Sequence, residues 1–416
     1  MNVGFVVTEL LDGRFVPWEE VLEWESYLDL YCLAIRRRGH KGIIYVPSIG
    51  VSKTETYVHK FGHAVKRIPA YNRLLAPKAL LPARPYEAGY TTVFGQALGP
   101  PFTLNLLTEA ARDGTQLLHY SSYYTSFFVP AFLIGGRIPI VVQYTGGALP
   151  QDNPQRLFWK LSIIPALQAS RAVLLGDYGS EIRALVHDLA VPRKKQEFFD
   201  APIVDSAVFH ESDKNEAQRK LGFDPHMKNI LSVTYIPKRH SILFAKDPYL
   251  MVDIIGRAIR RGGDDIMLHL AGFGIGIEEF REYVIAAGLE KRVRIFGKIP
   301  HEQLPLYYSA CDLVFVPYRL EKLNEGLATI EAFACNRPVT AFKRHDSDPV
   351  DQRGGFLVED RPEQGGATLL DRLRRPGYLE GKGKEGMAVS GQCTIESAGK
   401  RLEEIYAKVL RNTNRS

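Results

Sequence analysis

The stretch NEGLATIEAFACNRPV, residues 324–339, predicts a tight turn that leads into a short helix. Asn324 and Gly326 are turn formers, and the residues after them are good helix and core residues. Pro338 ends the helix because it has no N–H group and restricts the residue that precedes it. The stretch therefore predicts a helix with a free N-terminus directly after a turn.

Apolar segments flank this stretch on both sides. Residues 311–318, CDLVFVPY, and residues 339–342, VTAF, each predict a buried parallel strand. The resulting βαβ unit has its loop at the carboxyl end of a strand, where open α/β sheets bind ligands. A helix N-terminus at this place offers N–H groups and a positive dipole end to an anion, typically a phosphate. Glu325 and Glu331 can accept hydrogen bonds from sugar or ribose hydroxyls, although an ordinary βα turn explains the same pattern.

Strands and helices alternate over most of the chain, which predicts an α/β fold of doubly wound parallel sheets. Residues 202–214, PIVDSAVFHESDK, interrupt the alternation and predict a linker. We expect two Rossmann-like domains, residues 1–203 and 204–394, that face each other across a cleft. The helix at about 395–416 is a candidate to pack back on the first domain. Residues 54–100 give no clear pattern, and residues 381–386, GKGKEG, predict a flexible turn.

The composition is that of a globular protein, with 416 residues of which 45% are hydrophobic and 24% are charged. The four cysteines form no CxxC pair, so we expect a reducing compartment and no structural zinc. The first residues, MNVGFVVTEL, lack the basic segment of a signal peptide. The longest apolar run, residues 127–142, is broken by proline, glycine and arginine and is too short to span a bilayer. These features predict a cytoplasmic protein.

The formal net charge is +6, and basic residues recur in local groups such as RRRGHK, residues 36–41. Such groups favour phosphate-bearing ligands or a peripheral contact with an anionic membrane, and solvated helix faces explain them equally well. A nucleic-acid partner is not expected, because the sequence has no helix-turn-helix, RRM or zinc-finger pattern.

Several segments, in order and spacing, resemble a known family. RVRIFGKIPHEQLPLYYSACDLVFVPY, residues 292–318, and EGLATIEAFACNRPV, residues 325–339, carry most of the resemblance. IMLHLAGFG, residues 266–274, and VDSAVFHE, residues 204–211, add to it. Together they resemble glycosyltransferase family 4, which has the two-domain GT-B architecture.

The resemblance implies an enzyme that moves a sugar from a nucleotide-diphosphate sugar, UDP- or GDP-linked, to an acceptor hydroxyl. It further implies retention of anomeric configuration and no metal or other cofactor. The second domain would bind the donor and the first would bind a sugar, glycolipid or small-molecule acceptor. The residues that it implies for donor binding are Lys238, Arg239, Gly274, Gly297, Lys298, Ile299, Glu325, Gly326, Leu327, Ala328, Thr329 and Glu331.

The chain departs from the family pattern at several positions. Leu323 stands where the family has its first glutamate. Either Glu325 replaces that carboxylate from a shifted turn, or the donor sugar is held differently. The arginine that binds the diphosphate falls near Tyr235, and Lys238 and Arg239 are the candidate substitutes. The family's glycine pair after the first strand and its histidine after the fourth strand are absent.

His119, in LLHYSS, is therefore the candidate catalytic histidine, beside Glu325 as the candidate catalytic carboxylate. The alternative for His119 is a structural histidine at a strand end. Tyr120, Tyr123, Tyr144 and Thr145 are the candidate acceptor-binding residues, with core packing as the alternative for the aromatic ones.

Two other functions remain open at this point. The chain can be a GT-B relative such as a sugar-nucleotide epimerase or a disaccharide phosphorylase. It can also be a catalytically weak pseudo-glycosyltransferase that supports a partner enzyme, which the missing first glutamate favours. The sugar, the acceptor and the oligomeric state do not follow from the sequence.

Overall fold

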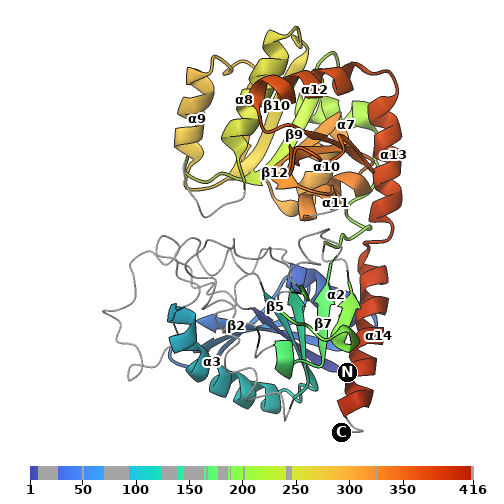
Figure 1. Cartoon of the computed structure of the whole chain (residues 1–416). Helices are drawn as coiled ribbons and strands as arrows, with labels where there is room; N and C mark the ends of the chain where they lie inside the picture. The colour runs from blue at the N-terminus through green and yellow to red at the C-terminus, as the bar shows by residue number, and fades with distance from the viewer. Residues whose placement is uncertain are drawn as a thin grey trace. The chain divides into compact units, whose positions relative to one another are not determined.

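The computed structural model describes residues 1–7, 27–48, 51–69, 93–122, 138–144, 164, 167–176, 186–187, 189–199, 202–239, 246–323 and 326–413. The chain forms two compact units (Figure 1). The first consists of Met1–Ala201 and Ile395–Ser416, and the second of Pro202–Thr394. Within the described ranges, no helix combines the length and the apolar character that crossing a membrane requires.

The first unit is built on an eight-stranded sheet in the order β3-β4-β2-β1-β5-β6-β7-β8. Its strands are β1 (Asn2–Val7), β2 (Lys41–Ser48), β3 (Glu55–Val58), β4 (Ala64–Pro69), β5 (Leu117–Ser122), β6 (Ile140–Tyr144), β7 (Ala172–Leu175) and β8 (Gln196–Phe198). All neighbours are parallel except the antiparallel pair β3 and β4. The strands β2 and β7 are buried along almost their whole length, as expected for a parallel sheet covered on both faces.

The helix α14 (Ile395–Thr413) belongs to the first unit, although it follows the second unit in the sequence. It packs along α2 (Tyr27–Arg37), and the same unit also contains α3 (Val93–Arg112) and the short η3 (Arg193–Lys195). Leu402 and Tyr406 on α14 are completely buried. The ion pair between Arg38 and Glu403, 2.5 Å, lies at the rim of this contact. Exposed ion pairs contribute little to stability, so burial of the apolar face of α14 contributes most of the free energy of its contact with α2.

The second unit contains a seven-stranded sheet in the order β11-β10-β9-β12-β13-β15-β14. Its strands are β9 (Lys228–Tyr235), β10 (Ile266–Phe273), β11 (Val293–Gly297), β12 (Leu313–Leu320), β13 (Val339–Lys343), β14 (Asp351–Gln352) and β15 (Gly355–Val358). Only β14 and β15 pair antiparallel. Its helices are α7 (Lys214–Leu221), α8 (Pro248–Arg260), α9 (Ile277–Ala286), η4 (His301–Gln303), α10 (Leu304–Ala310), α11 (Leu327–Ala334), α12 (Pro362–Arg374) and α13 (Tyr378–Ser390).

The strand order reverses direction between β9 and β12. The chain runs outward from β9 through β10 to β11, then returns to β12 on the other side of β9 and continues outward to β13. This arrangement is a topological switch point, and open α/β sheets bind ligands outside the carboxyl ends of the strands at such a point. The predicted α/β fold class, with two doubly wound parallel sheets, is confirmed.

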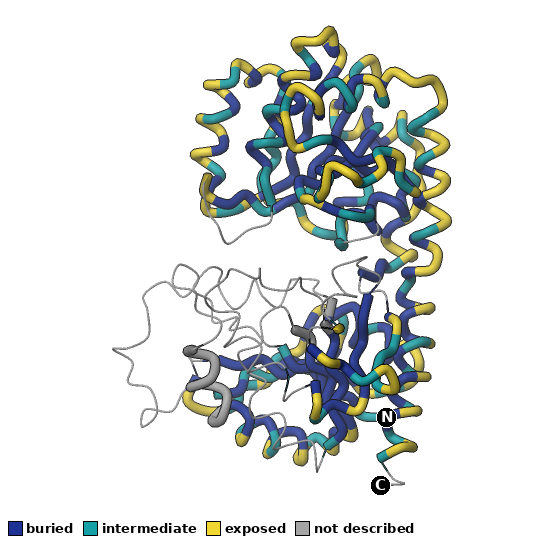
Figure 2. The backbone as a smooth tube through the Cα atoms, viewed as in Figure 1, coloured by how far each residue is buried: buried dark blue, intermediate teal, exposed yellow. Residues whose placement is uncertain are grey.

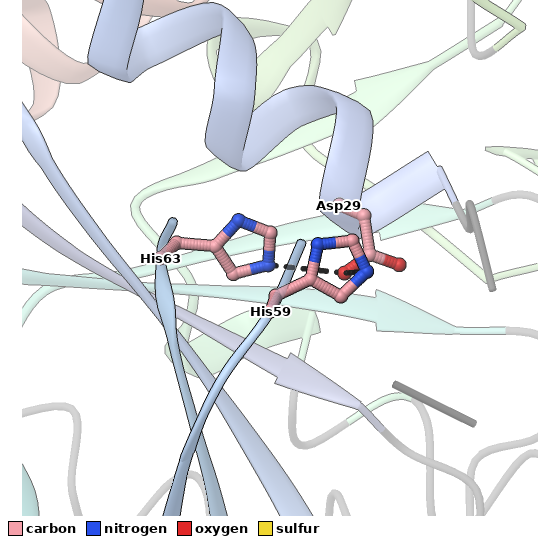
Figure 3. Close-up of side chains that lie close together, drawn as sticks. All are labelled: Asp29, His59 and His63. Atoms are coloured by element: carbon pink, nitrogen blue, oxygen red, sulfur yellow. Dashed lines mark hydrogen bonds and ion pairs between the residues drawn. The ribbon is translucent and has the colours of Figure 1, made fainter. Parts of the chain in front are cut away.

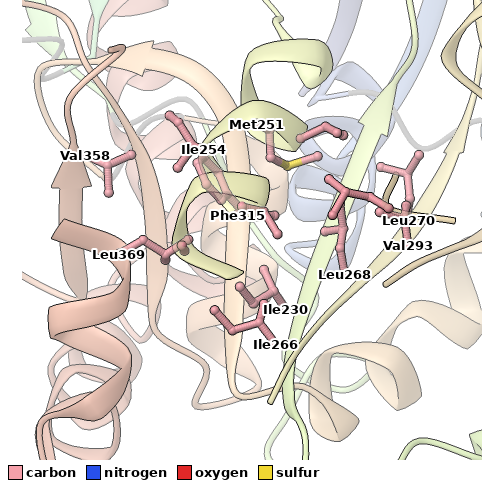
Figure 4. Packing of buried hydrophobic residues seen from close by; sticks show 14 of the residues in the cluster. Ile230, Met251, Ile254, Ile266, Leu268, Leu270, Val293, Phe315, Val358 and Leu369 are labelled. Atoms are coloured by element: carbon pink, nitrogen blue, oxygen red, sulfur yellow. The ribbon is translucent and has the colours of Figure 1, made fainter. Parts of the chain in front are cut away.

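The largest core of the second unit lies between its sheet and the helices α8 and α12 (Figure 4). Ile230, Leu268 and Phe315 project from the central strands and are completely buried. Met251 from α8 and Leu369 from α12 pack against the same cluster. Figure 2 shows the same division in both units, with buried strands inside and exposed residues along the outer helices.

The segment GKGKEG is helical, so the prediction of a flexible turn at residues 381–386 is wrong. These residues form the middle of α13. A Cβ atom on Gly386 would lie 2.4 Å from a ring carbon of Phe333 on α11. Glycine is present here because α11 and α13 approach closely, and the packing outweighs the low helix propensity of glycine.

Leu402→Ala tests the assignment of α14 to the first unit. We expect a loss of about 2–5 kcal/mol in the unfolding free energy of that unit, because a buried leucine leaves a cavity. Hydrogen–deuterium exchange should then speed up in α2 and not in the sheet of the second unit. Leu373→Ala on α12 is the matched control, and it should have the opposite pattern. Faster exchange in the second unit alone after Leu402→Ala would contradict the assignment.

Candidate functional site

Most of the predicted donor-binding residues lie where strands of the second sheet end. Residues 236–239 follow β9, residues 274–276 follow β10, residues 297–299 end and follow β11, and residues 326–329 begin α11 after β12. We call these four segments the carboxyl edge. Contacts join neighbouring segments: the Gly276 N–H donates to the Ile236 carbonyl at 3.1 Å, and the Lys298 ammonium lies 5.6 Å from the centroid of the Phe273 ring.

The N-terminus of α11 opens onto the carboxyl edge. Gly326 caps the helix with φ of 97° and ψ of 147°, a backbone conformation that is essentially restricted to glycine. A Cβ atom at this position would meet no atom within 4 Å. The glycine is therefore required by its backbone angles and not by crowding. The first N–H groups of an α-helix point out of its end and can bind an anion, and in α11 these are the N–H groups of Leu327 and Ala328 and the one that follows.

Glu331 lies one turn further along α11 and is 3% exposed. Its Oε1 accepts a hydrogen bond from His301 Nε2 at 2.7 Å, and its Oε2 accepts one from the Tyr308 hydroxyl at 2.8 Å. Burial, and next the charge of Glu331, raise the pKa of Tyr308 well above its usual value, so this hydroxyl stays protonated. Two donors thus compensate the cost of burying the carboxylate.

The predicted cations after β9 differ in their surroundings. Lys238 is exposed. The guanidinium of Arg239 lies 4.5 Å from the centroid of the Tyr283 ring, and the Arg239 backbone N–H donates to Glu279 at 3.2 Å. The guanidinium also lies 6.0 Å from the centroid of the Tyr249 ring on α8, so the side chain of Arg239 takes part in the packing of the second unit itself.

Lys246 is a further cation that the sequence interpretation missed. Its backbone forms a bridge with Tyr318 in β12, and its ammonium lies 5.2 Å from the centroid of the Tyr318 ring. Burial lowers the pKa of Lys246 to about 8, and no carboxylate contributes to the shift. A half-buried ammonium that no carboxylate among the described residues balances is suited to an anionic ligand. The signal in the sequence was a lysine directly before Asp247 and Pro248, which start α8.

Leu323 stands where the resembling family has a glutamate, and the structure explains its apolar character. The side chain is 1% exposed and belongs to the core cluster that includes Phe333 and Leu357. Glu325, the predicted replacement, lies outside the described residues, as do Tyr123 and Thr145. Tyr144 is the last residue of β6.

The structure corrects the predicted roles of His119 and Tyr120, because both side chains are completely buried in the first unit. His119 Nδ1 forms a hydrogen bond of 2.6 Å with the Tyr406 hydroxyl of α14. Its ring also stacks on Tyr31, with 6.0 Å between the centroids. Burial lowers the pKa of His119 to about 3, so it is a neutral core histidine. Neither residue can touch a substrate from this position.

Asp29, His59 and His63 form a separate buried cluster in the first unit (Figure 3). Asp29 lies on α2, and the two histidines flank the turn between β3 and β4. They are 7%, 2% and 2% exposed. Both imidazoles approach the same carboxylate oxygen, with His63 Nε2 at 3.1 Å and His59 Nε2 at 3.6 Å from Asp29 Oδ1. One candidate ligand atom from each residue lies within 4.8 Å of the others.

The hydrogen bonds of this cluster do not fit a metal site. A histidine that binds a metal usually donates its second ring N–H to another group. The Phe61 backbone N–H donates to His59 Nδ1 at 3.2 Å, so this nitrogen carries no proton and Nε2 does. His63 Nδ1 has no acceptor within the part of the chain that the structure describes. We therefore assign a structural cluster, in which His63 Nε2 donates to Asp29 at 3.1 Å and His59 Nε2 lies 3.6 Å from the same oxygen. The cluster ties the β3–β4 turn to α2.

Asp29→Ala should lower the unfolding free energy of the first unit by about 1–3 kcal/mol, because the buried His63 loses the acceptor of its hydrogen bond. Asp29→Asn keeps an acceptor oxygen and should cost less. EDTA should leave the melting temperature of the wild-type protein unchanged. A clear drop in melting temperature after chelation, restored by Zn²⁺, would instead show that these residues hold a metal.

Comparison with known proteins gives consistent similarities. Residues 241–374 match the family described as glycosyl transferases group 1. The D-inositol 3-phosphate glycosyltransferase of Segniliparus rotundus is 30% identical over 217 residues, which are 50% of this chain and 46% of that protein. The alpha-D-kanosaminyltransferase of Streptomyces kanamyceticus is 29% identical over 164 residues, 36% of this chain and 40% of that protein. The chain thus matches less than half of the length of either relative.

Solved structures resemble the chain over almost its entire length. Sucrose-phosphate synthase from Thermosynechococcus elongatus has a TM-score of 0.72 at 16% identity, covering 99% of this chain and 100% of that one. HepE from Anabaena, solved with UDP, has a TM-score of 0.68 at 14% identity, covering 98% and 100%. At this identity the likeness establishes the fold. The predicted GT-B architecture and the resemblance to glycosyltransferases are confirmed.

Proposed function

We propose that the chain is a glycosyltransferase that moves a sugar from a nucleotide-diphosphate sugar to a hydroxyl of an acceptor. The observation that carries the proposal is the Gly326-capped N-terminus of α11, which opens at the switch point of the second sheet. Structural neighbours support a nucleotide donor, since HepE from Anabaena was solved with UDP and with UDP-glucose. Starch synthase IV from Arabidopsis thaliana was solved with ADP and acarbose.

The carboxyl edge supplies what the leaving group of such a reaction requires. When the bond between the anomeric carbon and the diphosphate breaks, positive charge develops on the sugar and negative charge on the phosphate oxygens. The N–H groups of Leu327, Ala328 and Thr329 are fixed before the reaction and would stabilise that negative charge. The ammonium of Lys246 would add a positive charge in a partly dehydrated environment, where it acts more strongly than in water.

The remaining donor contacts follow from the residues nearby. Glu331 would accept hydrogen bonds from the ribose hydroxyls, and the backbone of residues 297–299 would flank the base. Lys238 is the exposed cation of the same edge. The first unit would bind the sugar, glycolipid or small-molecule acceptor, as the resemblance implies. Transfer with retention of configuration and without a metal belongs to the same proposal.

One observation favours a second candidate function. Leu323 is a core residue at the position of the family's first glutamate, so it supplies no carboxylate to the donor sugar, and that role would fall to Glu325 alone. A chain of this kind can bind a donor nucleotide and support a partner transferase. Release of nucleoside diphosphate from a sugar nucleotide by the purified chain, with an acceptor present, would exclude this alternative.

Titration calorimetry with UDP, GDP and ADP tests donor binding. We expect one of the three to bind the wild-type chain, and Glu331→Gln and Lys238→Ala each to weaken that binding by about 1–3 kcal/mol, the range for hydrogen bonds to charged groups. Glu363→Gln, an exposed change on α12, is the control and should leave the affinity unchanged. The proposal fails if neither these nucleotides nor their sugar derivatives bind.

The lowered pKa of Lys246 predicts a pH dependence. Without ligand, the ammonium is lost as the pH rises through about 8, so the affinity for the diphosphate should fall between pH 7 and pH 9.5. Because a bound anion favours the charged form, binding at pH 8.5 should take up a proton. Calorimetry in two buffers of different ionisation enthalpy measures this uptake. Lys246→Arg stays charged and should bind without proton uptake, whereas equal uptake in both proteins would rule out Lys246 as the contact.

A further inference from the structure

His301 connects two segments of the carboxyl edge through a single hydrogen bond. It starts η4, directly after the residues that follow β11. Its Nε2 donates to Oε1 of Glu331 on α11, which follows β12. The imidazole also packs against the Phe209 ring, with 4.8 Å between the centroids. The position of the Glu331 carboxylate is therefore tied to the segment at residues 297–299.

The two donors to Glu331 have different surroundings. Tyr308 is completely buried on α10, so its hydroxyl is part of the core. The side chain of His301 is 19% exposed, against 3% for Glu331. Of the two hydrogen bonds, the one from His301 is thus nearer to solvent and to the place where a ligand would approach.

The carboxylate keeps acceptor capacity for a ligand. Each of its oxygens has two lone-pair sites, and the hydrogen bonds from His301 and Tyr308 use one on each oxygen. A ribose presents two neighbouring hydroxyls that can donate to such a carboxylate. Because the two donors already fix both oxygens, the carboxylate has less rotational freedom left to lose when a ligand binds.

We propose that His301 is a positioning residue for the donor nucleotide, which holds the Glu331 carboxylate in the orientation that accepts the ribose hydroxyls. The inference rests on the proposed function, because it requires a nucleotide at the carboxyl edge. His301 does not touch the reacting atoms. Its contribution should appear in nucleotide affinity and in the recognition of the ribose, and not in the chemical step.

The test compares the affinities of UDP and 2′-deoxy-UDP for the wild-type protein and for variants. If GDP or ADP is the nucleotide that binds, its own pair of ribonucleotide and 2′-deoxynucleotide is used instead. We expect the wild type to prefer the ribonucleotide about tenfold, as for one lost hydrogen bond to a charged group. His301→Ala should weaken the binding of the ribonucleotide about tenfold and leave the affinity for the deoxynucleotide nearly unchanged, so that the preference disappears. His301→Gln carries an amide N–H at a similar reach and should restore most of the preference.

Three further measurements make the outcome decisive. The double variant His301→Ala with Glu331→Gln should bind the ribonucleotide no more weakly than Glu331→Gln alone, because both changes remove the same contact with the ribose. His226→Ala, an exposed histidine before β9, is the control and should behave as the wild type. If the alanine variant does not fold, His301→Asn, which is too short to reach Glu331, takes its place.

Each possible failure has a separate meaning. If the wild type binds no nucleoside diphosphate, the proposed function fails. If the wild type binds and Glu331→Gln weakens binding, but His301→Ala equals the wild type, the inference about His301 is overturned. Equal weakening of the ribonucleotide and the deoxynucleotide by His301→Ala would show a merely structural role and would also overturn it.

Discussion

The candidate site depends on the pairing of β12 with β9, because this pairing brings the loops after the two strands to the same edge of the sheet. Leu313 and Val314 pair with Ile230 and Leu231, so β12 returns to the centre of the sheet after the chain has moved outward through β10 and β11. The loop after β12 therefore lies beside the loop after β9. Because the strands are parallel, both loops and the N-terminus of α11 lie at the carboxyl edge. The N-terminus of α11, the half-buried ammonium of Lys246 and the buried carboxylate of Glu331 all belong to segments that follow these two strands.

The sequence allowed the fold to be predicted well because the strands are short, apolar and separated by clear helix and turn signals. CDLVFVPY is an example, since β12 is buried on both faces and the local pattern shows it directly. GKGKEG is the counterexample. Its glycines suggested a turn, but they permit the close contact between Gly386 and Phe333 of two helices. That contact depends on residues 53 positions apart, so a local pattern could not reveal it.

The site was predicted only in part, and the errors also have a non-local origin. His119 was proposed as catalytic from the resemblance to the family, yet Tyr406 of α14, 287 residues away, covers it. Lys246 was missed because its lowered pKa comes from burial beside Tyr318, which no spacing rule indicates. Glu331 was identified from the motif, but its two donors, His301 and Tyr308, were not. Motifs therefore located the backbone segments that we propose for donor binding, whereas the burial of the side chains around them could not be predicted from a local pattern.

The most direct measurement of the central claim is hydrogen–deuterium exchange of the wild-type chain with and without a saturating nucleoside diphosphate. If the N-terminus of α11 binds the diphosphate, the amides of Leu327, Ala328 and Thr329 should exchange more slowly with the nucleotide bound. The segment at residues 297–299 should also be protected, because it would flank the base. Unchanged exchange in both segments, with protection elsewhere in the chain, would contradict the assignment of this edge as the donor site.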